Sequence, residues 1–262
     1  MGTQLGRVDV SSFGDEPQRP ARLRGYGHCY FDRLGVLAML DLDMDTPQPV
    51  RGNFERQLLR VQRDLLRMGA LVENSCVLAR EALCDRNLDA AQRLHRHDKQ
   101  IDQFYRQIEV DCMHLFTLQA QPDAEDLRRI GAFMQLVRDL ERIGDYAEDL
   151  GEVAIKLFPY PVHPLMGRVQ TMLDRCRSMV AMCLLALSDL DAASGLEIKQ
   201  KDDAIDSDYD ELYALLAHQT NLVGSVEPTV LLVLAIRYME RIADHATNIG
   251  KRVAYIVTGE RT

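Results

Sequence analysis

The chain carries one segment twice, and this internal repeat constrains its fold more than any other feature. ALCDRNLDAAQRLHRHDKQID from Ala82 aligns without a gap with ALSDLDAASGLEIKQKDDAID from Ala186. RDLERIGDYAEDLG from Arg138 aligns with RYMERIADHATNIG from Arg237, with seven identities in fourteen positions. The offset falls from 104 to 99 residues between the two alignments, which places a shorter connection in the second copy. Duplication of one structural unit is the simplest explanation.

Long stretches without proline begin at Phe54, with apolar residues at every third or fourth position. This spacing predicts amphipathic helices. We expect breaks near Cys84–Asn87, Gln119–Pro122, Pro159–Pro164, Asp189–Asp191 and Asn221–Pro228. The predicted fold is all-α, a tandem repeat of two antiparallel three-helix bundles with six long helices. We assign residues 51–160 to the first repeat, 161–262 to the second, and residues 1–50, which are rich in turn formers, to a poorly ordered N-terminal extension.

Composition excludes several classes of protein. A net charge of −9 argues against a nucleic-acid binder, which needs a concentrated excess of Lys and Arg. Six cysteines without a Cys-x-x-Cys pair suit free thiols in a reducing compartment. The longest stretch without Asp, Glu, Lys, Arg or His, Ser178–Ser188, has 11 residues, against roughly 20 for a membrane-spanning helix. No export signal is evident either, so we expect a cytoplasmic protein without membrane insertion.

An aspartate interrupts the apolar seam of the second helix in both copies. Asp98 takes a seam position in the first copy and Asp202 the matching position in the second. A buried, unpaired carboxylate would cost several kcal/mol, so a cation is expected to face it. Asp102 and Asp206 follow one helical turn later.

The third helices add a second acidic pair to each copy, with Glu and Asp four residues apart on one helix face. If the second and third helices pack together, four carboxylates converge in each copy. Their mutual repulsion raises their pKa values unless a cation joins them, and oxygen ligands suit magnesium, calcium, manganese or iron better than zinc. The predicted metal ligands are Asp98, Asp102, Glu141 and Asp145 in the first copy and Asp202, Asp206, Glu240 and Asp244 in the second.

Salt bridges are the alternative explanation for these acidic pairs. Arg142 and Arg241 directly follow the two glutamates, and Arg138 and Arg237 precede them by three residues. Acidic pairs of this spacing are also common on solvated helix faces. Recurrence in both copies favours metal binding, with Arg142 and Arg241 as hydrogen-bond partners behind the ligands.

Histidines contribute less to the prediction. His95 is matched by Lys199 in the other copy, which favours a surface role. His245, beside Asp244, could supply a ligand to the second site only, although the matching Tyr146 favours an outer or solvent position. No nucleophile elbow or glycine-rich phosphate loop is visible, so nothing marks a catalytic nucleophile.

LERIGD at Leu140–Asp145, MERIAD at Met239–Asp244, and the segments DKQID from Asp98 and DDAID from Asp202 resemble the motifs of the PhoU family. The resemblance covers about Phe54–Glu260 and leaves residues 1–50 without a counterpart. It implies two three-helix bundles side by side, multinuclear metal sites at the acidic motifs, and a cytoplasmic role in phosphate homeostasis. Members of that family act as adaptors between the phosphate ABC transporter and a sensor histidine kinase, repressing the phosphate-starvation response when phosphate is plentiful.

We therefore expect a regulator rather than an enzyme, with the transporter ATPase, the kinase and a second copy of the chain as partners. The expected cofactors are divalent or trivalent ions, with iron, manganese and magnesium favoured. A carboxylate-bridged di-iron redox protein is one alternative, although such proteins carry two Glu-x-x-His motifs and this chain has none. A metal or phosphate store is another. Thr247 and Asn248 replace Glu148 and Asp149, which predicts weaker metal binding in the second copy if that turn contributes ligands.

Overall fold

The computed structural model describes residues 50–118, 123–219 and 224–261, and all but the last residue of the predicted N-terminal extension lies outside this range. The described chain forms helices without strands, which confirms the predicted fold class. The predicted breaks are confirmed wherever the connections are described. The helices are α2 (Val50–Cys84), α3 (Leu88–Leu118), α4 (Ala124–Leu157), α5 (Met166–Asp189), α6 (Ala192–Ala217) and α7 (Glu227–Thr258).

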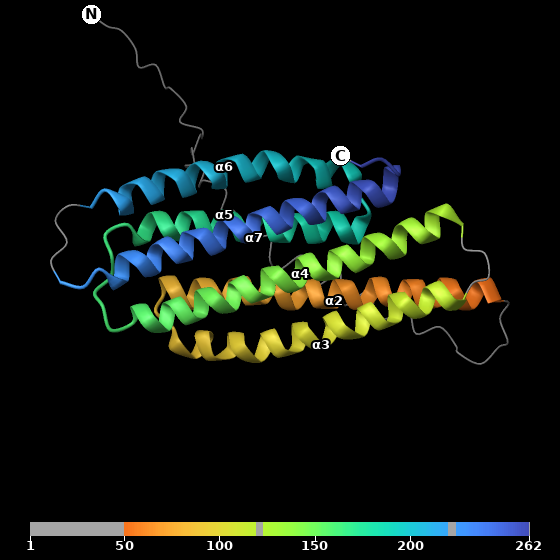
Figure 1. The fold of residues 1–262 in the computed structure, drawn as a ribbon, viewed down its shortest axis with the longest axis horizontal. Coiled ribbons are helices and arrows are strands. Elements are labelled where there is room, and N and C mark those ends of the chain that lie inside the picture. Colours follow the sequence, from red (N-terminus) through yellow and green to blue (C-terminus); the bar gives the residue numbers. More distant parts are fainter. Residues whose placement is uncertain (1–49, 119–122, 220–223, 262) are drawn as a thin grey trace, which may run out of the picture.

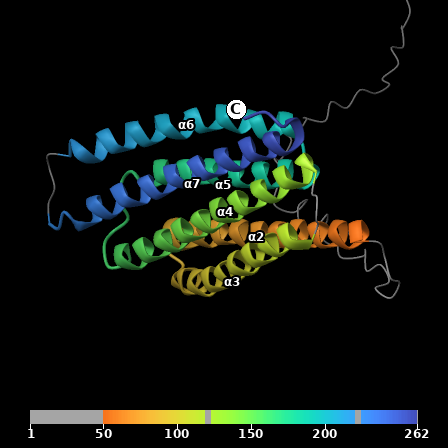
Figure 2. The same ribbon diagram turned by 45° about the vertical axis from the view of Figure 1, so that its right-hand side comes forward.

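The helices form two antiparallel three-helix bundles that lie side by side (Figures 1 and 2). Helices α2, α3 and α4 pack against one another in the first bundle, and α5, α6 and α7 in the second. The bundles join where α4 packs along α7 and α2 along α5. Their buried apolar residues form one continuous cluster, so the two repeats share a core. No helix among the described residues combines the length and hydrophobicity needed to cross a membrane.

Helices α6 and α7 approach each other closely at two glycines. A Cβ atom added to Gly195 would lie 2.6 Å from the backbone oxygen of Gly250, so neither position has room for a side chain. The matching pair in the first repeat is Ala91 and Gly151, where the Cβ of an added residue at Gly151 would lie 2.6 Å from Leu94 Cδ1. In each repeat this contact sets the spacing between the second and third helices, which carry the acidic motifs.

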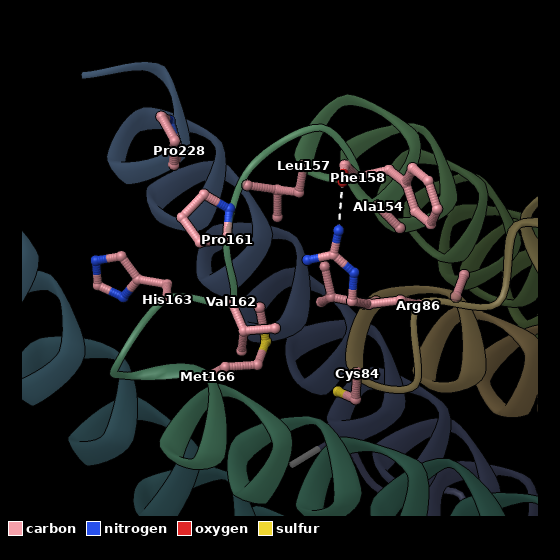
Figure 3. Close-up of a pocket in the computed structure, with 12 residues that line it drawn as sticks. Cys84, Arg86, Ala154, Leu157, Phe158, Pro161, Val162, His163, Met166 and Pro228 are labelled. Atoms are coloured by element: carbon pink, nitrogen blue, oxygen red, sulfur yellow. Dashed lines mark hydrogen bonds between the residues drawn. The ribbon is translucent and has the colours of Figure 1, made fainter. Parts of the chain in front are cut away.

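The connection between the repeats is held by Arg86, which follows α2 with a positive φ of 56°. Its guanidinium donates hydrogen bonds to the carbonyl oxygens of Phe158 and, over 2.9 Å, Tyr160, and lies 5.0 Å from the Phe158 ring centroid. Figure 3 shows Arg86 reaching towards this connection at a pocket that His163 and Pro228 line on the other side. On the side of the second repeat, the Tyr160 hydroxyl donates to Glu227. The connection is therefore tied to both bundles.

Candidate metal centres

Helix α3 meets α4 in the first repeat where Ile101 packs against Gly144. A Cβ atom at Gly144 would lie 2.9 Å from Cδ1 of Ile101, so the glycine permits the close approach. Asp102 directly follows Ile101 and Asp145 directly follows Gly144. The motif carboxylates therefore flank a close contact between the two helices.

The four predicted carboxylates of the first repeat influence one another strongly enough to form one electrostatic cluster. Burial, followed by the charge of Glu141, raises the pKa of Asp145 to about 7. Burial also raises the pKa of Asp98 to about 6, with Glu148 and Asp102 as the next causes. The pKa of Glu141 is raised by burial, and Arg142 opposes that rise. Carboxyl groups from both helices thus form one acidic centre. Asp98 and Asp145 in it are partly protonated near neutral pH.

Arginines neutralise part of this first centre. Arg142 Nη1 lies 3.0 Å from Asp145 Oδ2, and Arg142 Nε lies 3.4 Å from Glu141 Oε2. Arg106 Nη1 lies 3.1 Å from Asp102 Oδ2. Within the described residues, Asp98 is the one motif carboxylate of this centre without such an ion pair. Because the guanidinium side chains of Arg142 and Arg106 are 48% and 64% exposed, these are solvent-screened contacts of modest strength.

The second centre has the same layout on α6 and α7. Asp202 is buried, with 8% of its surface exposed, and its pKa is raised by burial and then by Asp206 and Asp244. Burial and the charge of Asp244 likewise raise the pKa of Glu240 and of Asp206. Arg241 Nη1 lies 2.7 Å from Asp244 Oδ2, and Arg237 Nη1 lies 2.8 Å from Glu240 Oε2. All four predicted residues again belong to one cluster.

An unsatisfied carboxylate oxygen at the second centre fits the chemistry of a cation site. Oδ1 of Asp202 and Oγ1 of Thr247 are buried, and neither makes a hydrogen bond of good geometry. The atoms here that could ligate a metal are oxygens, which suit hard cations. As the described side chains lie, however, no three His, Cys, Asp or Glu groups converge on a common metal position. Ligation would require each carboxylate to turn a free oxygen towards the ion, and metal binding stays a prediction.

A histidine–glutamate pair distinguishes the first centre from the second. His95 Nδ1 lies 2.6 Å from Glu148 Oε1, and Glu148 in turn raises the pKa of Asp98. Sequence reasoning gave His95 a surface role and did not connect the two residues. A signal was present, because Lys199 and Thr247 replace both members together in the second copy.

His245 points towards the first repeat instead of serving the second centre alone. Its Nδ1 lies 2.9 Å from Asp139 Oδ1 on α4, and both side chains are 14% exposed. His245 also opposes the rise in the pKa of Glu141, so it lies near the first centre. The role of Asp139 could not be deduced from the sequence, because it depends on how α4 and α7 rotate against each other.

Comparisons with known proteins agree with this architecture. The model of the PhoU domain family matches residues 65–154 and 169–253, once in each bundle. A "Phosphate-specific transport system accessory protein PhoU homolog" from Synechocystis sp. is 49% identical over 84% of this chain and 98% of its own length. A Pseudomonas putida protein of the same name is 36% identical over 79% of this chain and 81% of its own. The crystal structure of PhoU from Pseudomonas aeruginosa superposes with a TM-score of 0.74 at 33% identity, covering 79% of this chain and 100% of that chain.

Proposed function

The chain belongs to the PhoU family, and from this premise we propose that it is an accessory protein of phosphate transport that regulates phosphate uptake and phosphate-starvation signalling. The observation that carries the proposal is the 49% identity to a phosphate transport accessory protein homolog over 98% of its length, together with both acidic centres. Both repeats keep every motif carboxylate. A regulatory role accounts for this arrangement without a catalytic nucleophile.

The finer proposal is that the protein is a cytoplasmic adaptor. It binds the ATPase of the phosphate ABC transporter and a sensor histidine kinase, acts as a homodimer, and represses the starvation response when phosphate is plentiful. Two bundles with a shared core support this role, because they offer separate faces to two partners on one rigid body.

We further propose that both acidic centres hold iron, manganese or magnesium. In the first, Asp98, Asp102, Glu141 and Asp145 are the ligands. The second uses Asp202, Asp206, Glu240 and Asp244. The raised pKa values of these carboxyls mean that their ionised forms are disfavoured in the metal-free protein. A bound cation would supply the positive charge that stabilises the ionised forms. Arg142 and Arg241, which pair with the carboxylates in the structure, would keep one oxygen of their partners oriented.

A gene-deletion experiment tests the regulatory proposal. Deleting the gene should leave a phosphate-responsive promoter active in phosphate-rich medium, and the intact gene should restore repression. A promoter that stays repressed after deletion would contradict the proposal. Immobilised protein should also retain the transporter ATPase from a mixture of purified components, and failure to retain it would remove the adaptor role.

The metal proposal needs its own measurement. Elemental analysis of the purified protein should find iron, manganese or magnesium, and Asp98→Asn with Asp102→Asn should lower the content by about half. Arg106→Gln is the matched control, since it removes the ion pair to Asp102 while keeping all ligands. An unaltered protein that contains no metal and ignores added Mn²⁺ would leave the salt bridges as the full explanation of these motifs.

A further inference from the structure

The outer helices of the two repeats differ in charge at equivalent exposed positions. The exposed cations along the outer side of α3 are Arg96, Lys99 and Arg106. The offset of 104 residues maps them onto three exposed residues of α6, which are Gln200, Asp203 and Asp210. Because the two helices hold equivalent places in their bundles, this loss and reversal of charge concerns the surface and not the fold.

A second row of cations lies on α2, the neighbouring helix of the first repeat. The row is Arg60, Arg63 and Arg67, and its equivalents in the second repeat are Pro164, Gly167 and Thr171. The same offset pairs the buried Met68 with the buried Met172, which supports this alignment. We call the two rows together the basic edge. The second repeat carries no cation at any of the equivalent positions.

Both rows border the line along which α2 packs against α3. Arg60 and Arg67 are exposed and belong to a stripe of α2 that reaches Ser75 at helical spacing. Oγ of Ser75 lies 3.5 Å from Nδ1 of His97 on α3, and Arg96 directly precedes that histidine. The two rows therefore meet at one edge of the molecule and face solvent together.

Carboxylates neutralise the basic edge only in part. Asp64 is shared by two of the arginines, with its Oδ1 2.9 Å from Arg67 Nη1 and its Oδ2 3.9 Å from Arg60 Nε. Arg106 pairs with Asp102. The cations that make no ion pair with any described residue are Arg63, Arg96 and Lys99. The edge thus keeps a local positive charge on a chain whose net charge is −9.

Large apolar side chains are exposed beside these cations. Val110 and Met113 are 63% and 56% exposed, and they follow Arg106 along the outer side of α3 by four and seven residues. Their equivalents on α6 are Ala214 and Ala217. A helix face that combines cations with exposed apolar side chains is typical of proteins that lie on an anionic bilayer.

We propose that the basic edge binds the anionic lipid surface of a membrane as a peripheral contact, with Val110 and Met113 reaching the headgroup layer. Clusters of roughly four to eight Lys and Arg side chains are attracted to such surfaces. This inference goes beyond the proposed function, because the contact needs neither a metal nor a partner protein.

The net negative charge of the chain does not oppose this contact. Charges separated by more than about 8 Å are largely screened at physiological ionic strength. The acidic helix α6 lies at the opposite edge of the molecule from α3, with α4 and α7 between them (Figures 1 and 2). The protein should therefore bind with α2 and α3 towards the lipid and with α6 away from it.

Sedimentation with lipid vesicles tests the proposal on the full chain. The vesicles contain either phosphatidylcholine alone or phosphatidylcholine with phosphatidylglycerol, and the buffer contains a chelator. At about 0.15 M salt, the protein should sediment only with the anionic vesicles, and about 1 M salt should release it because the screening length falls to about 3 Å. Equal binding to both kinds of vesicle, or binding to neither, would overturn the proposal.

A charge variant locates the contact on the molecule. It combines Arg63→Gln, Arg96→Gln and Lys99→Gln, which break no ion pair between described residues. Its affinity for anionic vesicles should fall by at least about 10-fold. The matched control removes the same charge from other helices with Lys156→Gln, Arg168→Gln and Lys201→Gln, and should stay within about 2-fold of the unaltered protein. Circular dichroism verifies that both variants keep their helices.

Val110→Ala with Met113→Ala tests the apolar part of the contact, because it installs the residues of the second repeat and leaves every charge in place. We expect binding to anionic vesicles to weaken by at least about 3-fold. Unchanged affinity would show that these side chains do not reach the lipid.

Two further results would overturn the assignment of the edge. A charge variant that binds anionic vesicles as tightly as the unaltered protein would place the contact elsewhere. If instead the unaltered protein ignored the vesicles, and the charge variant lost binding to the purified transporter ATPase, the edge would belong to a protein partner. Neither result bears on the regulatory function, which the promoter experiment tests separately.

Discussion

Glu148 lies beside Asp98 in the first repeat and raises the pKa of that aspartate, whereas the uncharged Thr247 occupies the equivalent position beside Asp202. One centre gains a carboxylate, and the other gains a neutral hydroxyl in a more deeply buried place. The first repeat therefore holds more negative charge at its centre, in line with the sequence-based expectation of unequal copies.

The raised pKa values of Asp98, about 6, and Asp145, about 7, predict how the metal-free protein responds to pH. Both carboxyls bind protons more tightly in the folded chain than in the unfolded chain. Stability is therefore greatest below about pH 4 as far as these groups are concerned, and falls as pH rises to about 7. Because both groups are partly exposed, we expect a loss of about 1 kcal/mol for each. Urea unfolding in the presence of a chelator at a series of pH values measures it.

Asp98→Asn provides the control for this pH dependence. The variant should lose the contribution of Asp98 to the slope between about pH 4 and pH 6 and keep a reduced contribution of Asp145, because Asp98 is one cause of the raised pKa of Asp145. Glu125→Gln, on the exposed first turn of α4, should leave the slope unchanged. A slope of the opposite sign between pH 4 and pH 7 in the unaltered protein would show that other groups dominate its titration.

The sequence predicted the helices well because their apolar spacing and their breaks are local features. Leu94, Ile101 and Ile108 repeat along one face of α3, and each is buried as expected. It also singled out the acidic residues of both motifs, because the repeat presents each motif twice, and their role as metal ligands stays a prediction. It could not predict that Asp98 pairs with no described arginine while Arg142 serves both Glu141 and Asp145, since those choices depend on side-chain rotamers.

Gly195→Ala should destabilise the protein by about 2 kcal/mol. The new Cβ would lie 2.6 Å from the backbone oxygen of Gly250, and a backbone atom cannot give way as a flexible side chain does. Gly131→Ala in α4 is the control, because nothing lies within 4 Å of its added Cβ. That substitution should stabilise by about 0.5–1 kcal/mol through helix propensity alone. Urea midpoints of both variants measure these effects, and equal shifts would contradict the close approach of α6 and α7.

Arg86→Ala and Arg86→Gly should both destabilise the protein, and the glycine variant should be the milder of the two. Each loses the hydrogen bonds to Phe158 and Tyr160 that hold the connection between the repeats. The φ of 56° at this position strains alanine but suits glycine, a difference of about 1 kcal/mol. Chemical unfolding of the two variants isolates this backbone contribution. An alanine variant at least as stable as the glycine variant would show that the position does not hold this conformation.

Asp202→Asn should affect stability in opposite directions with and without metal. In chelator, the substitution removes a carboxylate that is 8% exposed and has one oxygen without a hydrogen bond. We expect a gain of about 1 kcal/mol at pH 7.5, seen as a rise of about 2–4 °C in the midpoint of thermal unfolding. With saturating Mn²⁺, the unaltered protein should gain binding free energy that the variant largely lacks, and the order should reverse. Asp203→Asn, the same change at the exposed neighbouring position, should shift neither midpoint by more than about 1 °C. A variant that is destabilised equally in both conditions would mean that Asp202 is retained for packing and not for a cation.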